Sequence, residues 1–231
     1  MAHYFITGTD TGVGKTFVTC ALLFTLKAQG IAAIGMKPIA AGGEMTPEGL
    51  NNADVEALHL ASGVKLQRED LNCYLLSEPI APHIAAANED IDIDLDVIRQ
   101  RFDQLAELAD VVLVEGVGGF IVPLADSINT ADLAQDLDLP VILVVGMRLG
   151  CLNHALLTQE AILARGLTLA LGRQSNRSAH GGIRRQYRSA GRTHSRAIAR
   201  CDRMAAAAGC GIDFPRFALA TLVLEINCHL F

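Results

Sequence analysis

The stretch from Gly8 to Thr16 constrains the fold of this chain more than any other. It reads Gly-Thr-Asp-Thr-Gly-Val-Gly-Lys-Thr and lies between an apolar run at residues 4–6 and a helical pattern over residues 17–29. A glycine-rich turn that joins a strand to a helix and ends in Gly-Lys-Thr is typical of a phosphate-binding P-loop, because its backbone N–H groups can approach phosphate oxygens. Lys15 would then reach the β- and γ-phosphates, and the Thr16 hydroxyl would bind Mg²⁺.

The loop departs from the strict P-loop pattern in two respects. Gly8 and Gly14 enclose five residues where the strict pattern has four, and Thr9 stands where that pattern has glycine. A glycine-rich turn with an incidental lysine is the alternative. The strand before the loop and the helix after it favour the phosphate-binding interpretation, because both are parts of a P-loop.

Segments with strand character alternate with segments with helical character as far as residue 170. This pattern predicts one α/β domain, a P-loop NTPase-like, doubly wound, mainly parallel sheet flanked by helices. We expect strands at residues 3–7, 31–36, 111–115, 141–145 and 167–170, and helices at residues 14–29, 53–61, 96–108, 130–137 and 154–164. Residues 40–52 are expected to be loop because glycines and Pro47 interrupt any period, and Asn153 is the expected N-cap of the last of these helices.

Two charged residues stand at the carboxyl ends of predicted strands, the edge at which open α/β sheets bind ligands. They are Lys37 and Glu115, and a strand-end carboxylate is how P-loop enzymes hold the second side of Mg²⁺. Each candidate also has a plainer interpretation. Lys37 would be a solvated loop lysine and Glu115 a buried strand end. Asp54, which opens the helix expected at residues 53–61, would likewise be a first-turn acid favoured by the helix dipole.

Composition favours a cytoplasmic protein that does not span a membrane. The 51% hydrophobic content fits a buried parallel sheet. No run of about 18 apolar residues indicates a transmembrane helix, and the N-terminus lacks the basic region of a signal peptide. The six cysteines form no C-x-x-C pair, so we expect reduced thiols.

The charge changes sign abruptly after residue 170. Residues 1–170 carry 9 Lys or Arg against 22 Asp or Glu, whereas residues 171–231 carry 10 Arg against 3 acids, so that −13 and +7 give the overall −6. Such a swing can indicate a tail that binds nucleic acid. These arginines have no aromatic platform and no known motif around them, so we expect no nucleic-acid partner.

Several motifs follow one another in a specific order. They are Gly8-Thr9-Asp10-Thr11, Gly14-Lys15-Thr16, Lys37-Pro38, Asp54, Pro82-His83, Glu115-Gly116-Val117-Gly118-Gly119 and Leu149-Gly150-Cys151-Leu152-Asn153-His154. Over residues 3–170 the chain therefore resembles the dethiobiotin synthetases, the ATP-dependent carboxylase-cyclases of biotin synthesis. That family has the same additional residue in its phosphate loop, so this departure from the strict pattern supports the resemblance.

The resemblance implies a homodimer that converts 7,8-diaminononanoate, CO₂ and ATP to dethiobiotin, ADP and phosphate. It implies that Mg²⁺ binds Thr16, Asp54 and Glu115, and that Lys15 and Lys37 are catalytic residues flanking the transferring phosphate. The implied nucleotide contacts are Gly12, Val13, Gly14, Lys15, Thr16, Phe17, Asp54, Glu115, Gly116, Val117 and Gly118. The implied substrate contacts are Lys37, Ala41, Gly150, Cys151, Leu152 and Asn153; backbone N–H groups of the last four meet the distal carboxylate across the dimer interface.

Two positions depart from the family pattern. Ala41 is often Ser or Thr in relatives, so a hydroxyl donor is lost here. The strand after residue 170 commonly reads Gly-Trp-Val-Ala-Asn, whose asparagine reads the adenine, and that motif is missing. The coding sequence TGG-GTC-GCC-AAT-CG encodes Trp-Val-Ala-Asn and the start of an arginine codon. When the reading frame begins one base before its first T, the codons become CTG-GGT-CGC-CAA-TCG. These translate as Leu-Gly-Arg-Gln-Ser, which is the sequence from Leu171 to Ser175. We therefore expect residues 1–170 to be the ligase core and residues 171–231 to be an out-of-frame tail of the same domain.

Two other interpretations remain open at this point. A P-loop switch ATPase of the partitioning or septum-site type would share the fold, although that class tends to carry an extra lysine early in its phosphate loop, and residues 9–11 offer none. The chain could also be an inactive frameshifted product, because missing strands would expose an apolar sheet edge.

Overall fold

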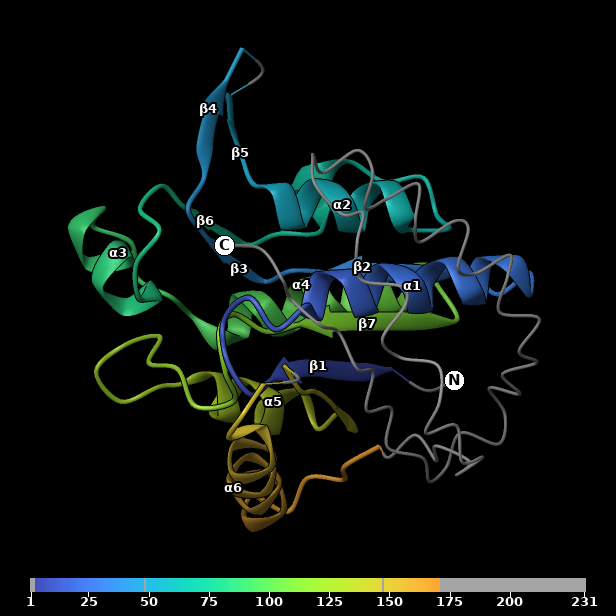
Figure 1. Ribbon diagram of the computed structural model, residues 1–231. Helices are drawn as coiled ribbons and strands as arrows, with labels where there is room; N and C mark the ends of the chain where they lie inside the picture. Colours follow the sequence, from blue (N-terminus) through green and yellow to red (C-terminus); the bar gives the residue numbers. More distant parts are fainter. Residues whose placement is uncertain (1–2, 48, 147, 171–231) are drawn as a thin grey trace, which may run out of the picture.

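A computed structural model describes residues 3–47, 49–146 and 148–170 (Figure 1). The segment expected to be out of frame, residues 171–231, lies outside the described residues, as does any base-reading position within it. Among the described residues, no helix is long and apolar enough to cross a membrane.

Four parallel strands form the central sheet. Their order is β2 (Ala33–Met36), β7 (Val111–Glu115), β1 (Tyr4–Gly8) and β8 (Val141–Val144). Every residue of the four strands is buried, as expected for a parallel sheet that is covered on both faces. Where a strand is expected to start, at residues 167–170, the described residues form a parallel bridge between Val141 and Leu169.

Helices cover both faces of this sheet (Figure 1). On one face α1 (Lys15–Ala28) and α2 (Ala53–Ala61) bury leucines such as Leu23 against the strands. On the other face α4, α5 and α6 share an apolar core with the strands; their bounds are Leu95–Leu108, Thr130–Leu137 and Cys151–Ala164. A shorter helix, α3 (Pro82–Asn88), begins at its proline. The predicted doubly wound, mainly parallel α/β fold is confirmed.

The expectation of loop over residues 40–52 was wrong. Here β3 (Ile39–Ala41) pairs in parallel with β6 (Tyr74–Leu76), which follows a short 3₁₀ helix, η1 (Arg68–Asp70). Next, β4 (Glu44–Thr46) and β5 (Gly49–Asn51) form an antiparallel hairpin that projects from the fold (Figure 1). The glycines that break the period make the turns, since Gly42 and Gly49 have φ of 77° and 109°.

The expected N-cap of α6 was also wrong. The helix begins at Cys151, and its N-cap is Gly150, which has φ of 94° and makes no side-chain cap. The Cys151 N–H donates to the Arg148 carbonyl oxygen at 3.0 Å, which closes a tight turn before the helix. A left-handed residue is needed in this turn, and glycine adopts that conformation freely. Asn153 therefore lies inside the first turn of α6.

Candidate active site

The loop between β1 and α1 closes tightly at the carboxyl edge of the sheet. A Cβ atom at Gly8 would lie 2.7 Å from Cγ2 of Val13, so a larger residue at this position would force the loop to shift. Gly14, with φ of 95°, is the N-cap of α1, and the Thr9 N–H donates to the Val144 carbonyl oxygen at 3.0 Å. The loop thus leads into the positive end of a helix, where an anion is favoured.

Lys15 is buried inside this loop. Its Nζ donates to the backbone carbonyl oxygens of Asp10 at 3.1 Å and of Gly118 at 2.6 Å. Burial, followed by the positive charge of Lys37, lowers the pKa of the Lys15 ammonium from 10.5 to about 8. A buried cation in this position is suited to receive an anion.

Lys15 should make the stability of the ligand-free protein depend on pH. Its pKa of about 8 in the folded state lies below 10.5, so the unfolded chain binds more protons between those values. The penalty of burying the charged lysine is complete below pH 8 and is relieved as the pH rises towards 10.5. As the pH rises across that range, the free energy of unfolding of the wild type should therefore increase by about 3 kcal/mol relative to that of K15M, as measured by urea denaturation. K27M, at an exposed lysine of the same helix, is the control; a constant difference between K15M and wild type would contradict the lowered pKa.

Glu115, at the end of β7, accepts hydrogen bonds on both of its oxygens. Lys37 Nζ donates to Oε1 at 2.6 Å, and the Thr16 hydroxyl donates to the same oxygen at 2.8 Å. The Thr19 hydroxyl lies 2.9 Å from Oε2. Glu115 is 0% exposed and Lys37 is 3% exposed, so the two charges compensate each other away from water.

Asp54 joins this cluster from the first turn of α2. Its Oδ2 lies 3.3 Å from Lys37 Nζ, and its side chain is about half exposed. Burial alone would raise the pKa of Asp54, but the Lys37 charge, the neighbouring Thr16 hydroxyl and the hydrogen bond from Lys37 hold it below its ordinary value. Burial likewise opposes the charge of Lys37, whereas Glu115 and Asp54 raise its pKa above 10.5. Lys37 and Asp54 are therefore both charged at neutral pH.

The oxygens around Lys37 form a donor set that suits a hard divalent cation. They belong to the Asp54 and Glu115 carboxylates and to the Thr16 hydroxyl, and Mg²⁺ prefers oxygen donors of these kinds. Each donor comes from a different element, α2, β7 or α1, so the set exists only in the folded protein. The Lys37 ammonium supplies the positive charge among these oxygens.

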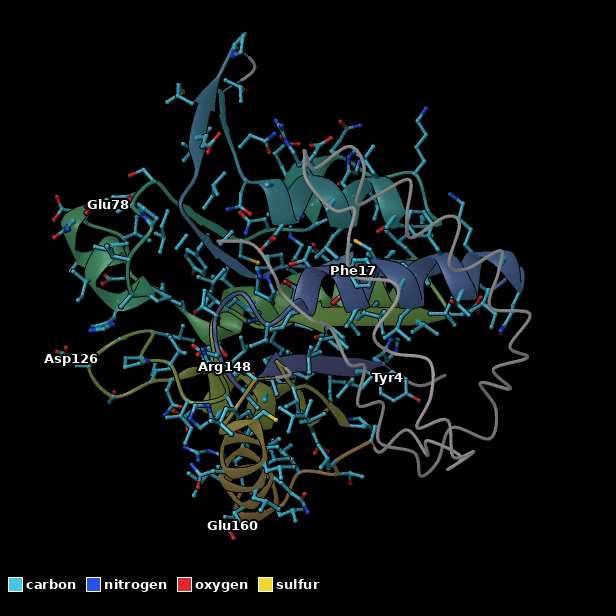
Figure 2. All side chains as sticks on the ribbon, viewed as in Figure 1. Tyr4, Phe17, Glu78, Asp126, Arg148 and Glu160 are labelled. Carbon is cyan, nitrogen blue, oxygen red and sulfur yellow. The ribbon has the colours of Figure 1, made fainter. Side chains whose placement is uncertain are left out.

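An ion pair joins the loop between β1 and α1 to the turn before α6. Arg148 Nη2 lies 2.5 Å from Asp10 Oδ2, and Figure 2 shows Arg148 beside the end of β1. The Thr11 N–H donates to Asp10 Oδ1 at 2.8 Å; this bond and the Arg148 charge lower the pKa of Asp10, against a smaller effect of burial. Four of the expected substrate residues follow this ion pair directly in the chain, at the N-cap and in the first turn of α6; they are Gly150, Cys151, Leu152 and Asn153.

The remaining predicted residues lie around this cluster. The Gly116 carbonyl oxygen is 3.4 Å from Lys37 Nζ, and the Gly118 carbonyl oxygen accepts from Lys15 Nζ. Residues 116–118 therefore border the cluster between these two lysines. Ala41 is tied to the start of α2, because the Asn52 side chain donates to the Ala41 carbonyl oxygen at 3.1 Å. Residues 12 and 13 belong to the loop between β1 and α1. Phe17 lies on α1, and its partly buried side chain packs against the core between this helix and the sheet.

Three side chains that contact site residues were missed by sequence reasoning. Asn52 accepts from the Asp54 N–H at 3.0 Å, and an asparagine directly before a predicted helix is a readable N-cap signal. Thr19 lies one turn after Lys15, which is a weaker signal. Asn72 donates to the Lys37 carbonyl oxygen at 2.7 Å, and nothing in the local pattern indicates that contact.

Comparison with known proteins agrees with this geometry. A family described as an AAA domain matches residues 2–172. ATP-dependent dethiobiotin synthetase BioD of Aromatoleum aromaticum is 58% identical over 167 residues, which are 72% of this chain and 74% of that protein. The same enzyme of Nitrosospira multiformis is 57% identical over 169 residues (72% of each chain), and BioD 1 of Escherichia coli O157:H7 is 50% identical over 168 residues (73% and 75%).

Among solved structures, a ParA family ATPase from Chlorobium tepidum aligns with a TM-score of 0.45 at 12% identity, over 73% of this chain and 70% of that one. This likeness is too low to carry an argument, so the assignment depends on the curated relatives and on the sheet. Their identity over nearly three-quarters of both chains confirms the resemblance inferred from the motifs. The chain belongs to the dethiobiotin synthetase family, the ATP-dependent ligases of biotin synthesis.

Proposed function

We propose that this protein carries out the ATP- and Mg²⁺-dependent carboxylation and ring closure of 7,8-diaminononanoate with CO₂ to give dethiobiotin. The observation that best supports this proposal is the cluster of Thr16, Lys37, Asp54 and Glu115 next to the P-loop lysine, Lys15. The cluster brings two cations and a set of oxygen donors to one edge of the sheet. Phosphoryl transfer depends on such positioning and charge neutralisation, and it needs no protein nucleophile.

The nucleotide lies along the closed loop. Backbone N–H groups of residues 12–17 bind its phosphates, residues 115–118 border it on the other side, and Lys15 donates to β- and γ-phosphate oxygens. Thr16, Asp54 and Glu115 would hold Mg²⁺, which when bound would neutralise phosphate charge. A Mg²⁺ ion held by these oxygens would repel the Lys37 ammonium, which would then turn towards the substrate.

The reaction proceeds through activated carbamate chemistry. An amine of the substrate captures CO₂ as a carbamate, and a carbamate oxygen attacks the γ-phosphorus of ATP and releases ADP. The second amine then attacks the carbonyl carbon of the carbamic–phosphoric anhydride, closes the five-membered urea and expels phosphate. Lys37 stabilises the carbamate and phosphoryl oxygens as charge grows on them, and Lys15 holds the phosphate chain in line for the attack.

The other end of the substrate lies at the start of α6. Its distal carboxylate binds backbone N–H groups among residues 150–153, apart from that of Cys151, which donates to the Arg148 carbonyl oxygen; the positive end of a helix favours the carboxylate. α6 buries only Ile162 and lies at the outside of the described fold, with four exposed leucines; they are Leu152, Leu156, Leu157 and Leu163 (Figure 1). An apolar face of this kind supports a homodimer in which α6 meets its copy.

We also propose that residues 171–231 are translated out of frame. The family match ends at residue 172, and the curated relatives align over about the same share of this chain, which supports the boundary. Resequencing the gene across codons 165–180 tests the proposal. A neighbouring frame that reads Trp-Val-Ala-Asn or similar would support it, and a region in which no frame contains such a motif would overturn it.

The activity is tested by incubating the full chain with 7,8-diaminononanoate, bicarbonate, ATP and Mg²⁺. We expect dethiobiotin, detected by mass spectrometry, to form together with ADP and only when all four components are present. ATP hydrolysis that does not depend on the diamine would instead favour a switch ATPase. Binding of Mg²⁺ and nucleotide without any product would mean that the chain is an inactive member of its family.

A further inference from the structure

Thr19 lies on α1, one turn after Lys15, and is 0% exposed. Its hydroxyl oxygen is 2.9 Å from Glu115 Oε2 and also 2.9 Å from the Lys15 carbonyl oxygen. Two acceptors therefore compete for this hydroxyl, one a charged oxygen on β7 and the other a neutral oxygen of its own helix.

The carboxylate is the stronger of the two acceptors. A hydroxyl group carries one hydrogen, and hydrogen bonds to an ionised acceptor are roughly twice as strong as neutral ones. Thr25 shows the ordinary case in the same helix, since its hydroxyl donates to the Ala21 carbonyl oxygen at 2.7 Å. Thr19 thus has a partner that an ordinary helical threonine lacks.

The two oxygens of Glu115 differ in what surrounds them. Oε1 accepts from Lys37 and Thr16, which both belong to the proposed phosphate and metal site. Oε2 faces Thr19, on the protein side of the carboxylate. The terminal torsion of a glutamate is broad, so hydrogen bonds at both oxygens decide how the carboxylate plane is turned.

We propose that Thr19 is the positioning residue that orients the Glu115 carboxylate towards a divalent cation. This inference rests on the proposed function, because Glu115 is a metal ligand only if the cation binds between Thr16, Asp54 and Glu115. Partners in this position commonly change metal affinity by about 10- to 100-fold when they are removed, because the ligand loses its orientation. Thr19 itself touches neither cation nor substrate.

The test uses T19V, which keeps the shape of the side chain and removes its hydroxyl. We expect the Kd of Mn²⁺, titrated by electron paramagnetic resonance in the presence of the β,γ-imido analogue of ATP, to rise about tenfold. T19S should restore the affinity to within about threefold of wild type, since it returns the hydroxyl. The Kd of the nucleotide analogue in EDTA should not change, because that binding depends on the loop. T25V is the matched control, since its hydroxyl serves only a backbone carbonyl in the described contacts.

The outcomes separate this inference from the function on which it rests. A T19V protein that melts at a lower temperature but binds Mn²⁺ as T25V does would reduce Thr19 to a structural residue and overturn the inference. So would a T19S protein as weak as T19V. E115Q, once a thermal melt has shown that it is folded, tests the proposed metal site itself: if E115Q keeps the wild-type Mn²⁺ affinity, the site fails and Thr19 fails with it. If E115Q loses Mn²⁺ while T19V keeps it, only the role of Thr19 fails.

Discussion

Replacing Lys37 by methionine is expected to lower kcat for dethiobiotin formation by about 100- to 1,000-fold. The buried ammonium lies 2.6 Å from Glu115 and 3.3 Å from Asp54, at the edge where the phosphoryl group is transferred in the proposed mechanism. Its interactions with carbamate and phosphoryl oxygens strengthen only as negative charge develops there, so the loss falls on kcat. The Kd of ATP should change by no more than about threefold, because the loop and Lys15 provide that binding.

The kinetic result needs a separate check of folding. Calorimetric titration with ATP measures the Kd, and a thermal melt establishes that K37M is folded. K27M changes a lysine at the far end of α1 and should leave both kcat and Kd unaltered. A K37M enzyme with near-normal kcat, or one whose defect lies entirely in ATP binding, would remove Lys37 from the chemistry.

Replacing Glu115 by glutamine should lower the free energy of unfolding of the ligand-free protein by about 3–5 kcal/mol. The change leaves the ammonium of Lys37, which is 3% exposed, with only the half-exposed Asp54 as its charged partner in the cluster. A buried charge that loses its partner keeps its desolvation cost without the attraction that offset it. Urea denaturation at pH 7 measures the loss.

The double variant K37M/E115Q separates this cause from simple damage to the core. With both charges gone no uncompensated ion remains, so the double variant should be more stable than E115Q alone. D136N is the control: Asp136 pairs with Arg99 at 2.9 Å, both side chains are partly exposed, and the loss there should stay below about 1 kcal/mol. Additive losses from K37M and E115Q would show that the pair does not act as a unit.

Much of this protein could be predicted locally. The P-loop, the helices that begin at residues 53 and 130, and the strand that ends at Glu115 follow patterns of neighbouring residues, and the structure places them within a residue of the prediction. Lys37 and Glu115 were candidates because the carboxyl ends of parallel strands meet at one edge. The order of motifs then indicated the family that the curated relatives confirm.

The contacts that build the site were decided by tertiary structure. β3 pairs with β6, and β4 forms a hairpin with β5, where the sequence showed only glycines and a proline. Likewise, Thr16 and Thr19 approach different oxygens of Glu115, although about a hundred residues separate them from it. The sequence by itself determined which residue types stand at the ends of strands and helices, because those depend on local periodicity. Only the tertiary structure decided that Lys37, directly after β2, and Thr16, at the start of α1, share an oxygen of Glu115, because the parallel register of β1, β7 and β2 sets distances between segments that no local pattern encodes.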